Sequence, residues 1–290
     1  MILPDISKNY LQQINHNLLT ENQVSLFILR LDLIHSDWGG NKFFKLKHHV
    51  DDALKKGFTS IGSFGGPWSN HLAALASFGI QNNISTIGKV RFNGDYTLYP
   101  TLVNAKKNEM QLFFLSNEEY EIEEKNANHL SDKNTYWIPS GGHTSLGVKG
   151  CEEILQLPCL LNKSNSFSHI IVPVGNGTTI AGISNSALSS QKIIGVCAVK
   201  NGAYLKDEIE VFSTKSNIEL WLDYHFGGFG KTNPTLINFM NFLNNNLQLP
   251  TDKVYTSKMM YAIWNKIEKG YFKSGSNILA IHTGGLQGNG

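Results

Sequence analysis

The sequence predicts an α/β protein in which helices flank mostly parallel β-sheet. Segments with the apolar spacing of helices alternate with short apolar segments along most of the 290 residues. One short segment, 169–174, is almost wholly apolar, as expected for a strand that is buried on both faces of a parallel sheet. Several strands run into glycines just before a helix, where such sheets bind ligands.

The first half of the chain begins this alternation with an amphipathic helix. Phe43, Leu46, Val50 and Leu54 have helical spacing, and Gly57 ends the segment. Ser69 is a suitable N-cap for a second helix. Strands are expected at 58–66, 84–90 and 111–116, and helices at 69–79, 101–110 and 117–130, the last an acidic, solvated helix.

The second half repeats the alternation, without an internal repeat or a low-complexity linker. Its clearest unit is an apolar strand at 169–177 followed by a helix at 178–188. Further strands are expected at 135–142, 192–200 and 277–283, and further helices at 145–157, 233–247 and 256–270.

Composition and charge exclude several classes of protein. Apolar residues make up 41% and charged residues 17%, which is typical of a globular protein. The net charge is +2 and both signs are interspersed, so a nucleic-acid or membrane partner is not expected. Three cysteines without framework spacing, and no signal peptide or apolar span, indicate a cytoplasmic protein with reduced thiols.

Four junctions between strands and helices are candidate ligand sites. The clearest is 175–179, where Gly175 and Gly177 permit a turn and two threonines add hydroxyl groups at a helix start. Such a loop is typical of a phosphate site, although an ordinary glycine turn is the alternative. It is no Walker loop, because Ile183 replaces the lysine, and no dinucleotide fingerprint, because Ile180 replaces the third glycine. The others are 39–42, 65–71, and the pair 254–258 and 282–285.

The lysine of the first junction gains meaning from the phosphate-type loop. A lysine becomes a nucleophile when burial or a neighbouring cation lowers its pKa. Alone, Lys42 could be a surface lysine near a helix start. Together with an anion site it favours pyridoxal 5'-phosphate (PLP), which needs an amine for its aldehyde and a site for its phosphate. Asn70 and the threonines of the fourth junction could contact the cofactor ring.

With these motifs in place, the sequence resembles the 1-aminocyclopropane-1-carboxylate (ACC) deaminase/D-cysteine desulfhydrase family. These are fold type II, tryptophan synthase β-like PLP enzymes, and the resemblance runs from about residue 29 to 285. GGNKFFKL at 39–46 resembles the lysine motif and implies Lys42 as the PLP lysine. The other motifs imply substrate contact by Ser69, phenolate contact by Asn70, a phosphate loop of Gly175, Asn176, Gly177, Thr178 and Thr179, a catalytic Tyr255, and ring-nitrogen contact near Thr256 and Thr283.

Three departures from the family pattern bear on the substrate. Thr256 stands where the deaminases carry glutamate, and a neutral hydroxyl makes the cofactor ring a weaker electron sink. His71 replaces a glutamine of the deaminases. Phe229 lies near the position of a family tyrosine and has no hydroxyl. The first departure favours a substrate with a good leaving group.

The expected activity is therefore β-elimination from a small amino acid, with D-cysteine giving pyruvate, hydrogen sulfide and ammonia. Lys42 would take the α-proton, Tyr255 would be the acid for the leaving group, and His71 would be a weaker one. The helix start at Ser69–His71 would bind the substrate carboxylate. Two alternatives are an ACC deaminase giving 2-oxobutyrate and ammonia, and a weakly catalytic PLP-binding protein.

The resemblance also implies the architecture. A large PLP-binding domain would comprise 1–46 and 161–290, a small domain 47–160, and the protein would form a homodimer. No metal site is expected, because the adjacent His48 and His49 face different directions on a helix. The three cysteines are expected to be buried, and Trp68 to be either a core residue or a wall of the site.

Overall fold

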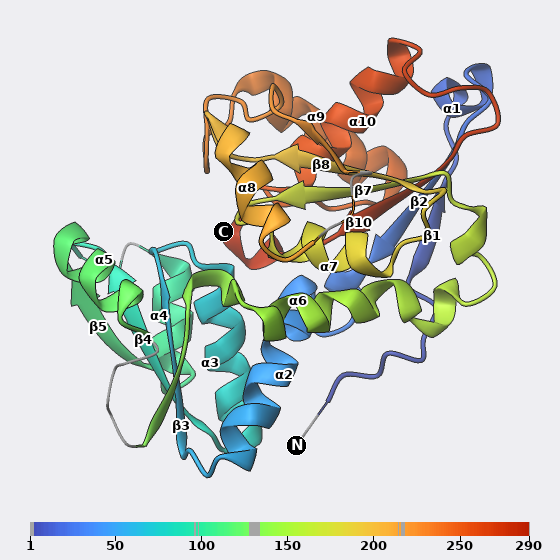
Figure 1. Ribbon diagram of the computed structural model, residues 1–290. Coiled ribbons are helices and arrows are strands. Elements are labelled where there is room, and N and C mark those ends of the chain that lie inside the picture. The colour runs from blue at the N-terminus through green and yellow to red at the C-terminus, as the bar shows by residue number, and fades with distance from the viewer. Residues whose placement is uncertain are drawn as a thin grey trace.

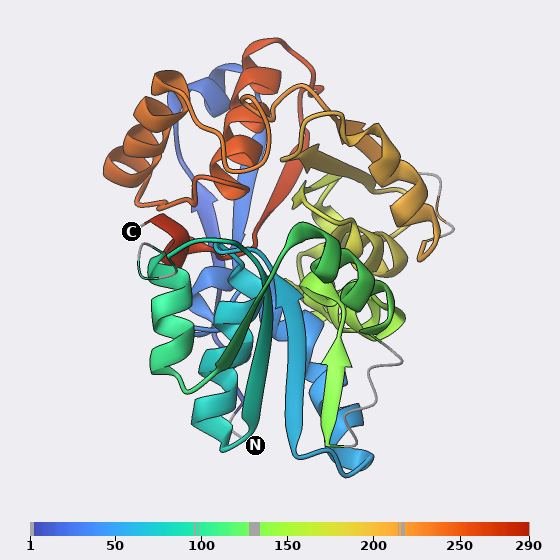
Figure 2. The ribbon, with the colours of Figure 1, turned by 90° about the vertical axis from the view of Figure 1, so that its left-hand side faces the viewer.

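Two β-sheets, each packed against helices, form two halves of the molecule (Figure 1). The computed structural model describes residues 3–95, 97, 99–127, 134–213, 215 and 218–289. The end of the chain lies between the halves, as Figures 1 and 2 both show. The fold class predicted from the sequence is confirmed.

The larger sheet has six strands in the order β1-β2-β10-β7-β8-β9. β1 pairs with β2 antiparallel, and all other pairs are parallel. His282 at the end of β10 pairs with Arg30 at the end of β2, so these two strands end level with each other. The strands are β1 (Leu11–Ile14), β2 (Ser25–Arg30), β7 (His169–Val174), β8 (Lys192–Cys197), β9 (Ile218–Trp221) and β10 (Asn277–His282).

The smaller sheet has four parallel strands in the order β5-β4-β3-β6. All six residues of β3, at its centre, are buried. Figure 2 shows α3 and α4 together on one side of these strands. The strands are β3 (Ser60–Gly65), β4 (Ser85–Arg91), β5 (Gln111–Leu115) and β6 (Thr135–Ile138).

The helices follow the predicted alternation closely between residues 41 and 107. The α-helices are α1 (Asn17–Glu21), α2 (Asn41–Lys55), α3 (Asn70–Asn82), α4 (Pro100–Lys107), α5 (Asn117–Lys125), α6 (Ser145–Glu152), α7 (Thr178–Ser186), α8 (Leu205–Glu210), α9 (Pro234–Leu247) and α10 (Thr256–Glu268). Short 3₁₀ helices are η1 (Leu31–Leu33), η4 (Ser140–Gly142), η5 (Glu153–Gln156), η6 (Pro158–Leu160), η7 (Ser164–Ser166), η8 (Gly202–Tyr204) and η9 (Leu286–Asn289).

Glycines let α2, α6 and α7 pack closely where the two halves meet. A Cβ atom at Gly150 of α6 would lie 1.7 Å from the carbonyl oxygen of Phe44 in α2. A Cβ atom at Gly182 of α7 would lie 2.5 Å from the Cβ of Cys151 in α6. Larger residues would force these helices apart, and with them the starts of α2 and α7.

Several elements differ from the sequence prediction. The strands β1, β2 and β9 and the short helices α1 and α8 were not predicted. The helix expected at 145–157 ends at Glu152 and continues as η5. The helix expected at 117–130 ends at Lys125, and residues 128–130 lie outside the described part.

The domain limits stay a prediction. Strands β3–β6 lie within 47–160 and the strands of the larger sheet lie outside that segment. However, the expected limit between residues 46 and 47 falls inside α2, which packs against α6 at the junction. A continuous helix therefore joins the two halves.

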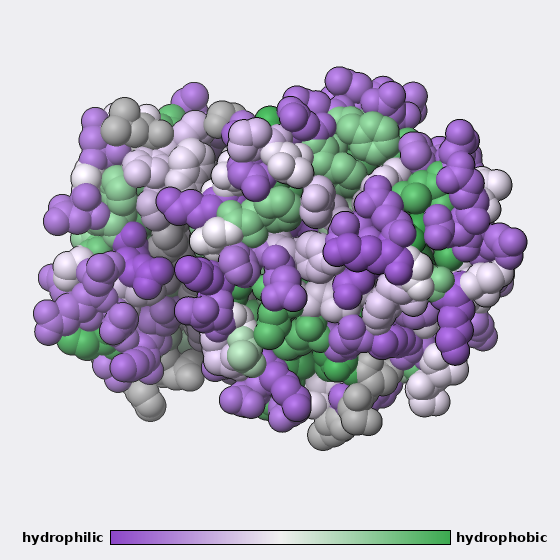
Figure 3. Space-filling model, turned by 90° about the horizontal axis from the view of Figure 1, so that it is seen from above, coloured by the Kyte–Doolittle hydropathy of each residue, from purple (hydrophilic) through white to green (hydrophobic). Residues whose placement is uncertain are grey.

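The face of the molecule that is seen from above is mostly hydrophilic (Figure 3). Seen from above, hydrophobic residues form separate patches between polar ones (Figure 3). Among the helices within the described residues, none is both long and apolar enough to cross a lipid bilayer.

Candidate active site

The candidate site lies where strand ends of the larger sheet meet the starts of α2, α3 and α7. The Asn41 backbone N–H donates to the Thr283 carbonyl at 3.3 Å, just beyond β10. The Asn41 side-chain amide donates to Thr179 Oγ1 at 2.8 Å, in the first turn of α7. These bonds bring the lysine motif, the phosphate-type loop and the last strand together, as strand ends of α/β sheets are expected to do.

Lys42 presents a reactive amine at this meeting point. Its Nζ donates to Asn41 Oδ1 at 2.6 Å, the single acceptor it has within the described structure. Burial and the positive charge of Lys45 lower the pKa of Lys42 to about 7, although Asp252 partly opposes this shift. About half of the Lys42 amines are therefore neutral near pH 7 and able to act as nucleophile or base.

The loop Gly175–Thr179 has the geometry of an anion site. Gly177 has a φ of 82° and is the N-cap of α7, so the chain can turn sharply into the helix. The backbone N–H groups of Thr179 and Ile180 donate to no acceptor among the residues that the structure describes. These free N–H groups and the positive end of the helix favour an anion.

Lys45 is a second cation beside this loop, and sequence reasoning missed it as a site residue. Its Nζ donates to Gly141 O at 2.9 Å and to Asn176 Oδ1 at 3.1 Å. Burial lowers the pKa of Lys45 to about 8. The spacing could have revealed it, because a residue three positions after Lys42 lies on the same face of a helix.

The start of α3 supplies a second set of donors. Ser69 is the N-cap, as predicted, and its Oγ accepts from Leu72 N at 3.2 Å. Asn70 Oδ1 accepts from Gln287 Nε2 at 3.1 Å, which leaves the Asn70 amide N–H groups without an acceptor among the described residues. The backbone N–H of His71 likewise has no acceptor there. The helix start can therefore bind a carboxylate, and Asn70 can donate to an anionic oxygen.

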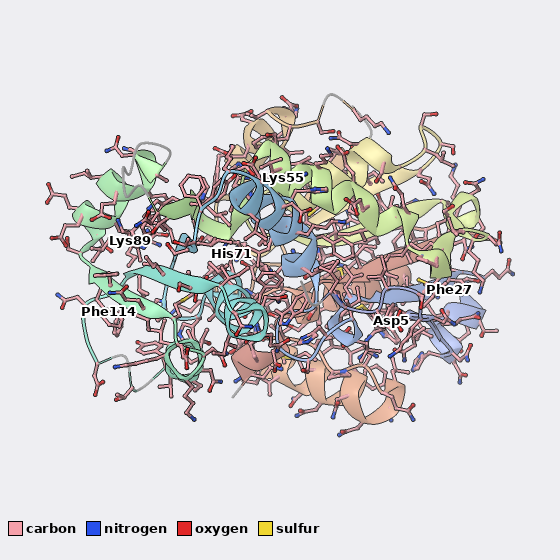
Figure 4. The ribbon with its side chains drawn as sticks, turned by 90° about the horizontal axis from the view of Figure 1, so that it is seen from below. Asp5, Phe27, Lys55, His71, Lys89 and Phe114 are labelled. Atoms are coloured by element: carbon pink, nitrogen blue, oxygen red, sulfur yellow. The ribbon has the colours of Figure 1, made fainter. Side chains whose placement is uncertain are left out.

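The ring of His71 is buried and has no exposed edge. The residue is 2% exposed, and both ring nitrogens lack surface and a partner within the described structure. The ring lies near the side-chain stem of Lys45 and near Gly142, between the two halves (Figure 4). Burial and the charges of Lys45 and Lys42 hold the pKa of His71 well below its usual value. The neutral ring keeps one N–H donor but is enclosed, so the expected role of His71 as an acid stays a prediction.

Tyr255 places its hydroxyl group against the anion loop. A Cβ atom at Gly175 would lie 2.9 Å from the Tyr255 hydroxyl, so glycine is required there. Burial, with the negative charge of Asp252, raises the pKa of Tyr255. The hydroxyl therefore keeps its proton and acts as a hydrogen-bond donor. The Phe229 ring packs against Tyr255 with centroids 5.7 Å apart and is 54% exposed.

The two threonines of the fourth junction differ in what their hydroxyl groups can do. Thr256 Oγ1 donates to Asp252 Oδ1 at 2.6 Å, so its proton is already used. Thr283 is buried, and its hydroxyl makes no hydrogen bond to a described residue. Thr283 is therefore the better-placed partner for a ring nitrogen. The Asp252 carboxylate also accepts from the backbone N–H groups of Val254, Tyr255 and Thr256.

A buried charged cluster supports the end of β10 behind Thr283. Asp32 Oδ1 lies 3.0 Å from His282 Nδ1, and Asp32 Oδ2 accepts from Arg30 at 2.7 Å. Although burial raises it, the bonds from His282 and Arg30 bring the pKa of Asp32 to about 2. His282 Nε2 lies 2.9 Å from the Pro250 carbonyl. Sequence reasoning missed this cluster, which fixes the backbone from which Thr283 projects.

The residues present fit PLP. Lys42 supplies the amine, and the free N–H groups of the 175–179 loop with Lys45 supply a site for a dianion. Asn70 would contact the phenolic oxygen and Thr283 the ring nitrogen. The site residues predicted from sequence are thus gathered in one place except for the His71 ring, while their individual roles stay predictions.

Other residues singled out in the sequence have structural roles. His48 bonds to Glu153 and His49 to Thr144, each at 2.7 Å, so the two rings face different partners. Trp68 is 43% exposed and is therefore no core residue. Cys151 and Cys197 are buried free thiols, whereas Cys159 is partly exposed, against the prediction that all three are buried.

Comparison with known proteins gives consistent relatives, although no family model matches the chain. A Thermotoga maritima protein with the provisional name ACC deaminase is 30% identical over 290 residues, covering 91% of this chain and 89% of that protein. D-cysteine desulfhydrase of Salmonella typhi is 26% identical over 290 residues, covering 90% and 86%. The crystal structure of an ACC deaminase homologue is 25% identical and matches with a TM-score of 0.84, covering 99% of this chain and 93% of its own.

These likenesses extend over nearly the whole length of both partners in each comparison. They agree with the order of motifs in the sequence and with the two-sheet fold. Pyridoxal 5'-phosphate is the cofactor of such proteins, and the residues of the candidate site fit it. The chain belongs to the ACC deaminase/D-cysteine desulfhydrase family of fold type II PLP-dependent enzymes.

Proposed function

We propose that this protein is a PLP-dependent lyase that removes a β-substituent from a small amino acid, with D-cysteine as the first substrate to test. With one water molecule, D-cysteine would give pyruvate, hydrogen sulfide and ammonia. The proposal is narrower than the family, because the curated relatives carry the names of two different activities.

One observation carries the choice of substrate. Of the two threonines assigned to the ring nitrogen, only Thr283 has a hydroxyl without a hydrogen bond to a described residue, and the Asp252 carboxylate near Thr256 already accepts four hydrogen bonds. A hydroxyl cannot share a proton with a ring nitrogen as a carboxylic acid can. Thr283 would therefore support negative charge on a bound cofactor ring only weakly, which favours a substrate whose leaving group departs readily.

The residues of this chain divide the work as follows. Bound PLP supplies a carbonyl group that links to amines and a ring that accepts the electron pair left at Cα. The free backbone N–H of His71, at the start of α3, binds the substrate carboxylate and orients the Cα–H bond, while the Asn70 side-chain amide faces the phenolic oxygen. Lys42, with its pKa of about 7, takes the α-proton. Tyr255 keeps its proton and donates a hydrogen bond to the departing group.

A thiolate suits this site better than a cyclopropane ring does. Thiolate leaves with its own electron pair and needs little help from an acid. ACC has no α-hydrogen and no such leaving group, so opening its ring requires a nucleophile and a stronger electron sink. The site offers Lys42 as a base, but the described residues include no free carboxylic acid near Thr283, because Asp252 accepts four hydrogen bonds.

The test is a substrate panel with the purified holoenzyme. D-cysteine, L-cysteine, β-chloro-D-alanine and ACC are each incubated with wild type and with Lys42→Ala, and pyruvate, 2-oxobutyrate and sulfide are measured. We expect pyruvate from D-cysteine and from β-chloro-D-alanine, at rates well above 2-oxobutyrate from ACC. Faster release of 2-oxobutyrate from ACC than of pyruvate from D-cysteine would contradict the proposal.

The same panel addresses the alternative of a weakly catalytic PLP-binding protein, which Phe229 favours because it lacks a hydroxyl beside Tyr255. That alternative predicts a cofactor absorbance band without release of either oxo acid. A cytoplasmic homodimer remains part of our proposal, and light scattering on the purified chain tests the oligomeric state.

A further inference from the structure

His143 connects three parts of the molecule beside the anion loop. It follows η4, on the side of the smaller sheet. Its Nδ1 lies 2.9 Å from Thr178 Oγ1 at the start of α7, and its Nε2 lies 3.0 Å from Glu208 Oε2 in α8. None of the sequence motifs or site roles described above uses this side chain.

The contacts continue from Thr178 and return to the segment that carries His143. Thr178 Oγ1 lies 3.0 Å from Asn176 Oδ1, within the loop itself. Lys45 Nζ donates to the same Asn176 oxygen at 3.1 Å and to Gly141 O at 2.9 Å. Gly141 stands two positions before His143, so the hydrogen bonds close a ring around the start of α7.

The donors and acceptors of this ring allow two arrangements. The Glu208 carboxylate can only accept, so Nε2 of His143 carries a hydrogen. In a neutral ring, Nδ1 accepts the hydrogen of the Thr178 hydroxyl. In a charged ring, Nδ1 donates to Thr178, whose hydroxyl then turns to Asn176 Oδ1. Both arrangements satisfy the observed distances.

The charges around His143 make it responsive to an anion. Burial lowers the pKa of His143, the bond to Glu208 raises it, and the positive charge of Lys45 lowers it, with a net lowering. Among the described residues, His143 also meets the edge of the uncharged Phe212 ring, with centroids 5.0 Å apart. An anion in the loop would offset the charge of Lys45 and so favour the charged form of His143.

We propose that His143 positions the anion loop from its anchor on Glu208, and that a dianion bound at the start of α7 makes His143 take up a proton from solvent. The proton adds to Nδ1, and no other covalent bond forms or breaks. The Thr178 hydroxyl turns to Asn176, which frees Lys45 to face the anion. His143 is thus a positioning residue, because it acts through Thr178. The inference rests on the proposed function only in taking the loop as an anion site.

The first test is a pH titration of His143 by NMR in the full-length chain without cofactor, with and without sulfate. Sulfate stays doubly charged over the range tested, so its own ionisation does not contribute. The signal is assigned by its loss in His143→Asn. We expect saturating sulfate to raise the pKa of His143 by about one unit or more, a tenfold change in proton affinity. Bound sulfate without any rise would overturn the proposal.

The second test counts protons by calorimetry of sulfate binding at about pH 6, in buffers that differ in ionisation enthalpy. Lys42 and Lys45, with pKa values of about 7 and about 8, are already mostly charged there and contribute little. Wild type should take up a fraction of a proton, and Glu208→Gln less, because it removes the charge that favours imidazolium. Equal uptake by wild type and His143→Asn would overturn the proposal.

Two replacements separate positioning from protonation. His143→Asn keeps an amide near the place of Nδ1 and should retain much of the sulfate affinity without proton uptake, whereas His143→Ala should lose both. Equal affinity of His143→Ala and wild type would show that His143 does not position the loop. If neither sulfate nor PLP binds to wild type, the proposed function fails together with this inference. If sulfate binds without moving the His143 pKa, the inference alone fails.

Discussion

Lys42 and Lys258 are two lysines withdrawn from solvent in one protein, and the acceptors around their amines differ. Burial lowers the pKa of Lys42 to about 7 and that of Lys258 to about 8. Lys258 Nζ donates to the carbonyls of His225 and Gly228, each at 2.8 Å, and to that of Ala198 at 3.4 Å. Lys42 Nζ donates to a single acceptor among the described residues, Asn41 Oδ1.

This difference separates an amine that holds structure from one that can react. All three hydrogens of a charged Lys258 point at carbonyl oxygens, so the amine has no open direction. Two of the three hydrogens of a charged Lys42 have no acceptor among the described residues. The lowered pKa values alone would make both lysines candidates for a reactive amine. The number of acceptors around each amine distinguishes Lys42 from Lys258.

Lys258 shapes the wall of the site through the loop that it holds. Phe226 and Gly228 in this loop have φ values of 51° and 125°, which the fixed carbonyl positions help to maintain. The loop carries Phe229 to Tyr255. The fully hydrogen-bonded amine of Lys258 therefore supports the site in which the amine of Lys42 can react.

The sharpest test of the contrast replaces each lysine in turn. Lys42→Ala should lower kcat/KM for D-cysteine about 10²- to 10⁴-fold, because the base is lost. Borohydride reduction and peptide mass mapping of wild type should place the pyridoxyl group on Lys42. Lys258→Met should keep that label. Labelling of Lys45 or Lys47 instead would remove the distinction on which the comparison depends.

The anion loop offers open N–H groups in the same way that Lys42 offers an open amine. Gly177→Asp should abolish retention of PLP through dialysis, because it adds a negative charge beside the dianion and a side chain that would meet Ile209 at 2.8 Å. Gly270→Asp is the control, since Gly270 also has a positive φ, 67°, but nothing within 4 Å. Normal cofactor content in Gly177→Asp would place the phosphate elsewhere.

The open amine should also show itself in the pH dependence of cofactor incorporation. Only neutral Lys42 can react, so the rate should rise about tenfold per pH unit below pH 7 and level off above about pH 8. Lys45→Met should move this rise to higher pH, because the charge of Lys45 helps to lower the pKa of Lys42. A rise centred near the ordinary lysine pKa would show that Lys42 is not perturbed. Stopped-flow absorbance after mixing with PLP measures the rate.

Residues close in sequence were predictable, and contacts between distant residues were not. The strand at 169–174 has five apolar residues in a row after His169. The strand β1 has four residues, two of them glutamines, and only Ile14 is buried. Lys42, Asn70 and the 175–179 loop follow motifs whose order can be read along the chain. The strand β1 could not be read that way, because its pairing with β2 depends on tertiary structure.

The supporting residues of the site were missed for the same reason. His143 is 35 positions from Thr178 and 65 from Glu208, and neither spacing belongs to a helix or a turn. Asp252 is nearer, four positions before Thr256, but the N-cap of α10 is Tyr255 and not Asp252. The capping pattern therefore gave no sign that the Thr256 hydroxyl was already in use.

The closed amine should matter for stability. Lys258→Met should lower the free energy of unfolding by about 1–3 kcal/mol, because the carbonyls of His225 and Gly228 are left unpaired. Urea unfolding of the cofactor-free protein measures it. Lys269→Met, at an exposed position, should change the free energy by less than about 0.5 kcal/mol. Equal effects at both positions would mean that the acceptors of Lys258 contribute little.

The smallest expected effect concerns two hydroxyl groups, one without a hydrogen-bond partner among the described residues and one that is already bonded. Thr283 has an open hydroxyl, so Thr283→Val should reduce turnover about fivefold, the effect of about 1 kcal/mol, with little loss of stability. The hydroxyl of Thr256 is closed by Asp252, so Thr256→Val should instead lower the free energy of unfolding, by about 1 kcal/mol, and change turnover less. Paired measurements of kcat and of urea unfolding on both variants decide. A greater loss of activity in Thr256→Val than in Thr283→Val would contradict this expectation. It would mean that Thr256 breaks its bond to Asp252 and turns to the ring nitrogen when the cofactor is bound. Free donors in the cofactor-free structure would then not identify the partners of the cofactor.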